Sequence, residues 1–199
     1  YLEANIADAV CIGQGEIAFL EIVQALESGE DLANVPGLAI QRDGQTVYTD
    51  HREVVGFDKF QPVPWHLLEY ERYAELQLRP TQKKVRHRFP LPGHWTEDNP
   101  PRAFSHFSSF GCPEACTFCC SPALTGRRWK AIAGKQLAEE IAELQQRFQF
   151  DVLRFQDANF GVAEKRSKEF CQELIDLQVP IYWNGTIEIE TIMRYKKDT

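Results

Sequence analysis

Apolar positions in the first fifty residues change from strand spacing to helix spacing and back. A short apolar run, Ala9 to Ile12, leads into the loop Gly13-Gln14-Gly15-Glu16, and apolar residues then recur at helical spacing from Ile17 to Leu26. Leu38 to Tyr48 alternates around Asp43-Gly44, a strong signal for a two-residue hairpin turn. We therefore predict a strand, a glycine loop, a helix and a hairpin.

The pattern becomes irregular from Phe57 to Pro101, where prolines interrupt any long regular element. We interpret this segment as a linker between domains, in which Trp65 to Leu78 favours a short helix. Arg79 to Arg88 carries basic residues and no acid, so it is interpreted as a solvated connector, with a phosphate or nucleic-acid site as the alternative.

After the linker, strand and helix patterns alternate. Ala103 to Phe110 and Val152 to Phe155 are typical of strands, and a third strand is predicted from Ile181 to Trp183, continuing through Ile187 and Ile189. Helical stripes separate these strands, at Leu137, Ile141, Leu144 and Phe148, and at Phe170, Leu174 and Leu177. This order predicts an α/β fold of βαβ units with right-handed crossovers and a parallel sheet.

Composition and charge narrow the function classes. An apolar content of 43% suffices for a sizeable core, and no stretch approaches the ~18 uninterrupted apolar residues of a membrane span. The 22 basic and 29 acidic residues give a net charge of -7, which argues against broad binding to nucleic acid. The N-terminus shows no secretory signal, so a cytoplasmic protein without a membrane span is expected.

The cysteines are unevenly distributed. Two of the six, Cys11 and Cys171, sit beside apolar residues and are interpreted as buried small hydrophobes. The other four crowd into nine positions, which indicates metal or redox chemistry rather than a disulfide framework. They are Cys112, Cys116, Cys119 and Cys120.

Thiolates are soft ligands that suit zinc or iron-sulfur clusters. A closed zinc site needs four ligands, usually as two separated pairs, and no second pair follows Cys120. Three ligands on a four-iron cluster leave one iron open to a small molecule. Zinc, a simple electron-carrying cluster and uncoordinated cysteines remain the alternatives.

The spacing CxxxCxxC, with Phe118 before the last cysteine and a strand just ahead of the loop, closely resembles the radical S-adenosylmethionine superfamily. The resemblance implies that Cys112, Cys116 and Cys119 ligate a [4Fe-4S] cluster, whose open iron binds the amino and carboxylate groups of S-adenosylmethionine. It implies further that Phe118 lines the adenine side, that the reduced cluster cleaves the cofactor, and that Cys120 is spare.

The same resemblance implies cofactor contacts on later strands. Asp157 is placed like the polar residue that meets the methionine amino group, with a helix cap or loop turn as the alternative. Asn159 fits a run seen in branches of the family. Many relatives carry an arginine after the third strand, and this chain has none there; Thr186 and Glu188 are candidates for the ribose or carboxylate side, or else form a plain polar strand face.

The N-terminal order of strand, glycine loop, helix and hairpin resembles the end of the cobalamin-binding domain that precedes many radical enzymes, although no DxHxxG sequence is present. That resemblance implies that Gly13, Gly15 and Glu16 lie beside the corrinoid. We expect an internal fragment: residues 1–56 end a Rossmann-like cobalamin-binding domain, 57–101 form the linker, and 102–199 begin a partial (β/α)6 TIM-like barrel.

The pairing of these domains implies a cobalamin-dependent radical enzyme that transfers a methyl group to an unactivated carbon. An oxidoreductase, such as an oxidative cyclase of tetrapyrrole synthesis, is the alternative enzyme. A non-catalytic iron-sulfur or zinc module and a tRNA-modifying radical enzyme are alternatives of other classes. The implied partners are a small-molecule or peptide substrate and a reducing protein such as a flavodoxin or ferredoxin, and no catalytic residue is assigned.

Overall fold

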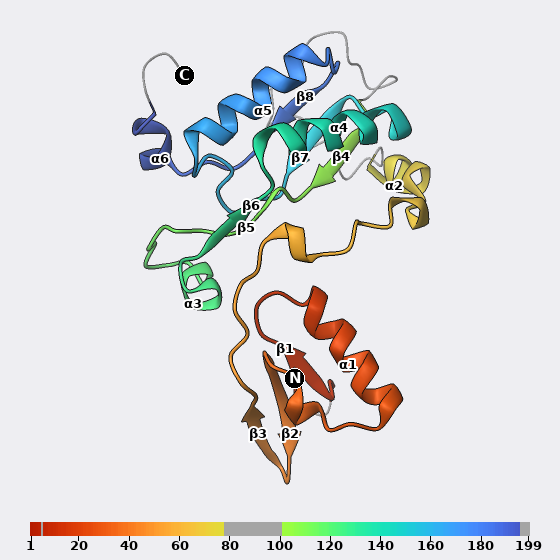
Figure 1. Ribbon diagram of the computed structural model, residues 1–199, viewed down its shortest axis with the longest axis vertical. Helices are drawn as coiled ribbons and strands as arrows, with labels where there is room; N and C mark the ends of the chain where they lie inside the picture. The colour runs from red at the N-terminus through yellow and green to blue at the C-terminus, as the bar shows by residue number, and fades with distance from the viewer. Residues whose placement is uncertain (5, 78–100, 196–199) are drawn as a thin grey trace. The chain divides into compact units, whose positions relative to one another are not determined.

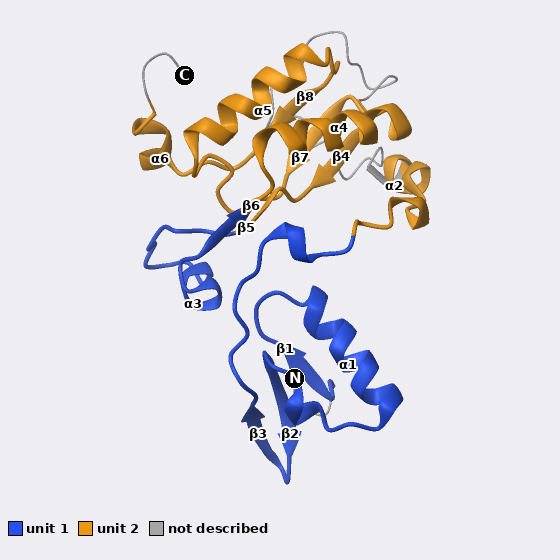
Figure 2. Cartoon of the chain, in the orientation of Figure 1, with its two compact units in different colours: residues 1–61, 111–130 blue, residues 62–110, 131–199 orange. Residues whose placement is uncertain are grey.

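The computed structural model describes residues 1–4, 6–77 and 101–195 (Figure 1). Its contacts divide the chain into two compact units, residues 1–61 with 111–130 and residues 62–110 with 131–199 (Figure 2). The domain division predicted from the sequence stays a prediction. The basic stretch from Arg79 to Arg88 lies outside the described residues.

A small antiparallel sheet organises the N-terminal part of the first unit. Strands β1 (Ala9–Cys11), β2 (Leu38–Arg42) and β3 (Gln45–Tyr48) pair in the order β1-β2-β3. The turn between β2 and β3 is Asp43-Gly44, and both residues have positive φ, at 48° and 76°. This is the turn geometry that matches the twist of a two-residue hairpin, so the predicted hairpin is confirmed.

Helix α1 (Glu16–Ser28) confirms the predicted helix but buries an unexpected face. Ala18 and Ala25 are buried, whereas Leu20 and Leu26 are 54% and 65% exposed. Small side chains let the helix backbone approach the sheet closely, and the larger side chains of the apolar stripe lie outside this core. The buried residues of the core are Ala18, Ala25, Val35, Leu38 and Ile40, and η1 (Leu32–Asn34) adds Leu32 at its edge.

The segment that follows contains short helices: η2 (Phe57–Lys59), η3 (Trp65–Leu67) and α2 (Tyr70–Gln77). The single helix predicted from Trp65 to Leu78 is therefore interrupted at Leu68. The reason lies in the packing of Trp65 and Tyr70, whose rings both contact Phe104, at centroid distances of 5.3 and 5.7 Å. Side chains five positions apart do not share a face of one continuous helix, so the break lets both rings reach the core.

A parallel sheet organises the second unit. Strands β4 (Ala103–His106), β7 (Val152–Phe155) and β8 (Tyr182–Asn184) pair in the order β4-β7-β8. Helices α4 (Gly134–Phe148) and α5 (Glu164–Asp176) pack against each other and lie together on one face of this sheet (Figure 1). The predicted βαβ order and parallel sheet are confirmed.

Aromatic side chains fill the space between this sheet and its helices. Phe104 stacks on Phe148 of α4, and Phe170 of α5 contacts both Phe155 and Trp183 edge-on, each pair at 5.4 Å between centroids. Such pairs contribute about 0.5–1.5 kcal/mol each beyond their burial. These contacts fix α4 and α5 against one face of the sheet, and neither of these helices covers the other face.

Two local predictions are corrected by the structure, and two further elements appear between them. The strand expected from Ala103 to Phe110 divides into β4 and β5 (Ser109–Gly111), because Ser108 is buried and its carbonyl accepts a bond from Ile132 instead of continuing the parallel ladder. The chain then forms α3 (Ser121–Thr125) and β6 (Trp129–Ala131), which pairs with β5. The third parallel strand ends at Asn184, and Ile189 begins helix α6 (Ile189–Met193) rather than extending the strand.

Candidate functional site

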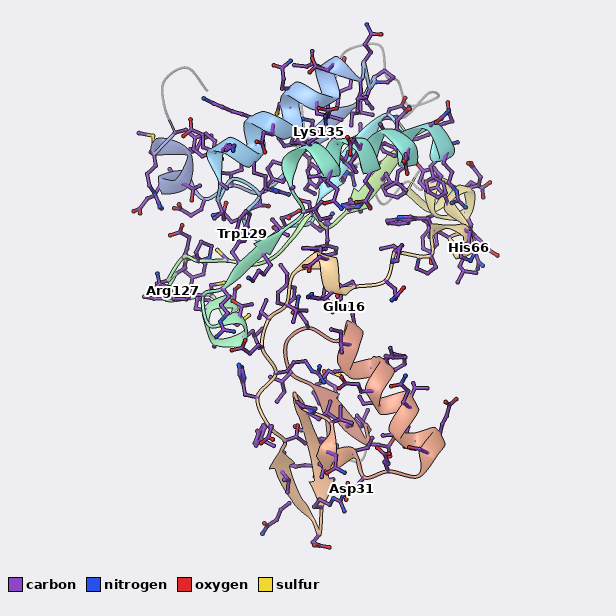
Figure 3. The ribbon with its side chains drawn as sticks, viewed as in Figure 1. Glu16, Asp31, His66, Arg127, Trp129 and Lys135 are labelled. Carbon is purple, nitrogen blue, oxygen red and sulfur yellow. The ribbon has the colours of Figure 1, made fainter. Side chains whose placement is uncertain are left out.

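The glycine loop of the first unit joins β1 to α1. Gly13 has φ of 90°, a conformation that favours glycine, and Gly15 is the residue before the helix, with no atom within 4 Å of the position its Cβ would take. Glu16 is the exposed first residue of α1 and is labelled in Figure 3. The loop therefore offers an open backbone surface at a helix N-terminus, as a closely approaching ligand requires.

Gln14 holds this loop in place. It is only 6% exposed, its side-chain amide donates to the carbonyl of Val55 at 3.2 Å, and its carbonyl oxygen accepts from the Val55 backbone N–H at 2.7 Å. The two bonds form a closed pair between segments far apart in the sequence. Sequence reasoning singled out the flanking glycines and missed this residue.

The cysteine loop has a narrow base. Gly111 immediately precedes Cys112 with φ of 81°, and an added Cβ would lie 2.1 Å from the carbonyl oxygen of Arg128. Arg127, labelled in Figure 3, donates from Nε to the carbonyl of Pro113 at 2.9 Å. The two ends of the loop are thus joined by backbone packing that only glycine allows at position 111.

The cysteines occupy different positions within this loop. Cys112 and Cys116 are half-buried, Cys119 and Cys120 are exposed, and no disulfide joins any of them. The backbone N–H of Cys119 donates to the carbonyl of Cys116 at 3.1 Å, and the Sγ of Cys119 accepts from the N–H of Ser121 at 3.4 Å. Cys120 is the residue that precedes α3, so its position is set by the start of a helix.

The donor set of the loop fits an iron-sulfur cluster. It supplies three soft thiol ligands from one short segment, Cys112, Cys116 and Cys119, and none of them forms a disulfide. In the part of the chain that the structure describes, no three side chains of His, Cys, Asp or Glu gather around the position of a single metal ion. Phe118, predicted to line an adenine, is 92% exposed beside these cysteines in sequence.

Asp157 is the centre of a buried hydrogen-bond network in the second unit. The carboxylate is 3% exposed and accepts from the backbone N–H of Ser108 at 3.2 Å, from the Ser108 hydroxyl at 2.9 Å, and from the Ser109 hydroxyl. These bonds join the end of β7 to the segment between β4 and β5. A carboxylate has about four acceptor positions, so three bonds leave little capacity for a further donor.

Arg166 of α5 completes this network. It is 6% exposed, its guanidinium donates to the Ser108 hydroxyl at 2.6 Å, and its Nε donates to the carbonyl of Ile132 at 2.7 Å. Burial lowers the pKa of Arg166 from its ordinary value, and the negative charge of Asp157 opposes that shift. Holding this network together is therefore another structural role for Asp157, besides the helix cap or loop turn that the sequence suggested.

The remaining predicted cofactor residues lie close to one another. Asn159 is fully buried; its amide donates to the Thr191 hydroxyl at 3.2 Å, and its carbonyl oxygen accepts from the N–H of Glu188 at 3.4 Å. The backbone carbonyl of Thr186 accepts from Phe160 at 2.9 Å, and the side chain of Thr186 is exposed. These residues bring the loops after β7 and β8 together.

Glu188 caps a helix rather than lying on a strand face. Its carboxylate accepts from the backbone N–H groups of Glu190 at 2.9 Å and Thr191 at 2.7 Å. These bonds lower the pKa of Glu188 from its ordinary value because they favour the charged form. The expectation of a polar strand face at residues 186–188 was wrong, because β8 has ended and the backbone turns into α6.

The structure thus gathers the predicted residues into two groups. Gly13, Gly15, Glu16 and the cysteine loop belong to the first unit, and Asp157, Asn159, Thr186 and Glu188 belong to the second. The assignment of cofactor and metal roles to all of them stays a prediction. No sequence pattern singled out Ser108 or Arg166, since Arg166 stands among charged residues that are mostly solvated.

The sequence is similar to curated proteins but not to a family model. No family model matches the chain. Among curated proteins, the chain is similar to an uncharacterised methyltransferase of Pyrococcus horikoshii, with 25% identity over 95% of this chain and 36% of that protein. It is also similar to the anaerobic magnesium-protoporphyrin IX monomethyl ester cyclase of Rubrivivax gelatinosus, with 28% identity over 98% of this chain and 32% of that protein. The chain therefore spans about a third of the length of these relatives.

Solved structures share the fold. The cobalamin-dependent S-adenosylmethionine radical enzyme OxsB, with aqua-cobalamin and S-adenosylmethionine bound, matches 96% of this chain and 24% of its own, with a TM-score of 0.66 and 18% identity. The radical S-adenosylmethionine methyltransferase TsrM of Kitasatospora setae, with cobalamin and a [4Fe-4S] cluster bound, matches 85% of this chain and 30% of its own, with a TM-score of 0.54 and 18% identity. The resemblance stated from the sequence is confirmed for the fold, as part of such a structure.

Proposed function

We propose that this chain is part of a cobalamin-dependent radical S-adenosylmethionine enzyme. The observation that carries the proposal is the loop of Cys112, Cys116 and Cys119, which comes after β4, the first strand of the parallel sheet, and the short strand β5, and carries three soft ligands on a base closed by Gly111. Relatives named for methyl transfer and for radical S-adenosylmethionine chemistry align over nearly the whole chain, which supports the assignment. When bound, a [4Fe-4S] cluster supplies the electron that cleaves S-adenosylmethionine.

The chain's own residues would have distinct tasks. Cys112, Cys116 and Cys119 would hold the cluster and leave one iron open, and Cys120, fixed at the start of α3, would stay free. Phe118 would cover the adenine, since its ring is exposed and apolar. Asn159, Thr186 and Glu188 lie after strands β7 and β8, at the edge of a parallel sheet where ligands commonly bind.

The glycine loop would hold the corrinoid. Gly13 and Gly15 expose their backbone, and the N–H groups at the start of α1 attract partial negative charge. Glu16 would lie at the rim of this surface. Cobalamin would carry the methyl group, and the substrate would be a small molecule or peptide with an unactivated carbon.

A second candidate, an oxidative cyclase, is supported by the Rubrivivax relative and by a further cyclase of the same name from Synechocystis, at 25% identity over 94% of this chain. Product analysis separates the two reactions. Methyl transfer would yield a methylated product and S-adenosylhomocysteine, whereas cyclisation would change the oxidation level of the substrate and transfer no methyl group.

A reducing protein such as a flavodoxin or ferredoxin would supply electrons, in keeping with a cytoplasmic enzyme. No helix in the described part of the chain is long and apolar enough to cross a membrane.

Anaerobic reconstitution of the full-length protein with iron and sulfide tests the proposal. We expect four irons and four sulfides per chain, an electron paramagnetic resonance spectrum that changes when S-adenosylmethionine is added, and a retained corrinoid absorbance. A protein that binds zinc instead, or a cluster indifferent to S-adenosylmethionine, would support a non-catalytic module. A protein that binds the iron-sulfur cluster but contains no cobalt would refute the role of cobalamin and leave the rest of the proposal standing.

A further inference from the structure

The two faces of the parallel sheet differ in character. Phe104, Leu153 and Trp183 share the helix-covered face, because they are paired in register across the three strands and parallel partners point the same way. The opposite face, here called the polar face, carries Ala103, Ser105, Val152, Arg154, Tyr182 and Asn184. Parallel sheets are usually apolar on both faces, so polar residues in the middle of the strands on one face need an explanation.

Ser105, Arg154 and Asn184 form one row across this face. Ser105 pairs with Arg154, and Arg154 pairs with Asn184. On this face, the row of Ala103, Val152 and Tyr182 comes first along the strands, and the row of Ser105, Arg154 and Asn184 comes next, closer to the carboxyl ends of the strands. Gln156, the next residue of this face along β7, donates to the Ser105 hydroxyl at 3.4 Å. The row is therefore at the end of the sheet where ligands of β/α folds bind.

Arg154 differs from the other part-buried arginines of this unit. Arg166 donates to carbonyl and hydroxyl oxygens, and Arg102 forms an ion pair with Glu71 at 2.6 Å. The buried Nε of Arg154, like that of Arg102, has no hydrogen-bond partner, but unlike Arg102 the Arg154 guanidinium forms no ion pair among residues 1–4, 6–77 and 101–195. Burying a donor without an acceptor costs free energy, so stability of the fold does not account for this arginine.

We propose that Arg154, with Ser105 and Asn184 beside it, binds the carboxylate of a small-molecule ligand. The planar guanidinium presents paired donors that match the two oxygens of a carboxylate. A serine hydroxyl and an asparagine amide flank it and supply further donors, and no carboxylate of the described residues competes for the site. The carboxylate belongs either to S-adenosylmethionine or to the substrate.

The test uses the full-length protein and three variants. Arg154→Gln removes the charge and the paired donors, and Arg154→Lys keeps the charge alone. Arg147→Gln is the matched control, because Arg147 is an exposed arginine of the same unit on α4, with its guanidinium 5.1 Å from the Phe148 ring centroid. Thermal unfolding without ligand checks the fold: if Arg154 serves a ligand, Arg154→Gln unfolds at the same temperature as the wild type or a higher one.

Two binding arms separate the sources of the carboxylate. In the first, calorimetry compares S-adenosylmethionine with its decarboxylated form. If the cofactor carboxylate is bound, the wild type prefers S-adenosylmethionine by about tenfold or more, and Arg154→Gln abolishes that preference while Arg147→Gln keeps it. This arm rests on the proposed function, and a wild type that binds neither form would count against the proposed function rather than against the carboxylate site.

In the second arm, acetate, succinate and citrate are added to the protein, with S-adenosylmethionine at saturation if the first arm shows that it binds and without it otherwise, and thermal shifts are compared with those in chloride at equal ionic strength. A shift that Arg154→Gln abolishes, and that Arg147→Gln retains, places the carboxylate on the substrate. Loss in either arm supports the proposal. Equal behaviour of wild type and Arg154→Gln in both arms, or a large loss of stability in ligand-free Arg154→Gln, overturns it.

Discussion

Replacing Asp157 with alanine removes the acceptor that joins the end of β7 to the segment leading into the cysteine loop. The substitution leaves the Ser108 N–H and the hydroxyls of Ser108 and Ser109 without their shared acceptor. It also leaves the buried charge of Arg166 without its nearest negative charge. Removing one partner of a buried charged network costs about 3–5 kcal/mol. That is a large share of the roughly 5–15 kcal/mol by which proteins are stable.

The predicted loss can be resolved into parts by milder substitutions. Asp157→Asn keeps an acceptor oxygen but loses the charge, so we expect a smaller loss of about 1.5–3 kcal/mol. Ser109→Ala removes one donor, and its effect should not add to that of Asp157→Ala, because both changes remove the same bond. Urea unfolding followed by tryptophan fluorescence and circular dichroism measures each change.

Asp176→Asn is the control for this series, since Asp176 bonds only to Gln172 on the exposed side of α5 among the hydrogen bonds described for it. We expect a change within about 0.5 kcal/mol for this variant. If Asp157→Ala were as stable as Asp176→Asn, the buried network would not hold the segment in place. Fully additive effects of Asp157→Ala and Ser109→Ala would likewise refute the shared bond.

Three further predictions concern the cysteine loop and α6. Cys116→Ala should abolish the absorbance of the reconstituted cluster while Cys120→Ala keeps it, and the reverse would overturn the ligand assignment. Gly111→Ala should lower the free energy of unfolding by about 1–3 kcal/mol or more, because its Cβ would lie 2.1 Å from the Arg128 carbonyl oxygen, whereas Gly126→Ala, with nothing within 4 Å, should cost less. Urea unfolding compares the two, and equal losses would contradict the packing argument. The lowered pKa of Glu188 means that its stabilising effect is present above pH 4.5, the unfolded value, and is lost as the pH falls through the lower folded value. Glu188→Gln should therefore reduce the melting temperature at pH 7, and a difference that persisted unchanged at pH 2 would count against the cap.

The sequence predicted those elements whose residues repeat with a clear period or carry a specific turn. The hairpin at Asp43-Gly44 and the parallel strand 152–155 appear where they were expected, whereas the first parallel strand is shorter than predicted. The periodicity of α1 predicted a helix but not its buried face, because Ala18, Ile22 and Ala25, rather than Leu20 and Leu26, contact the core. Apolar spacing alone does not report which neighbour an element packs against.

The candidate site likewise has features that neighbouring residues determine and features that depend on the tertiary structure. The amino-acid sequence by itself determined the cysteine spacing and the glycine loop, because each is a property of neighbouring residues that any fold must keep together. Only the tertiary structure decided that Asp157 is bonded to Ser108 and Ser109, and that Arg154 stands in a row with Ser105 and Asn184. Strand register and burial bring Asp157 to Ser108 across 49 positions of the chain and to Ser109 across 48, and no local pattern of side chains specifies such a distance.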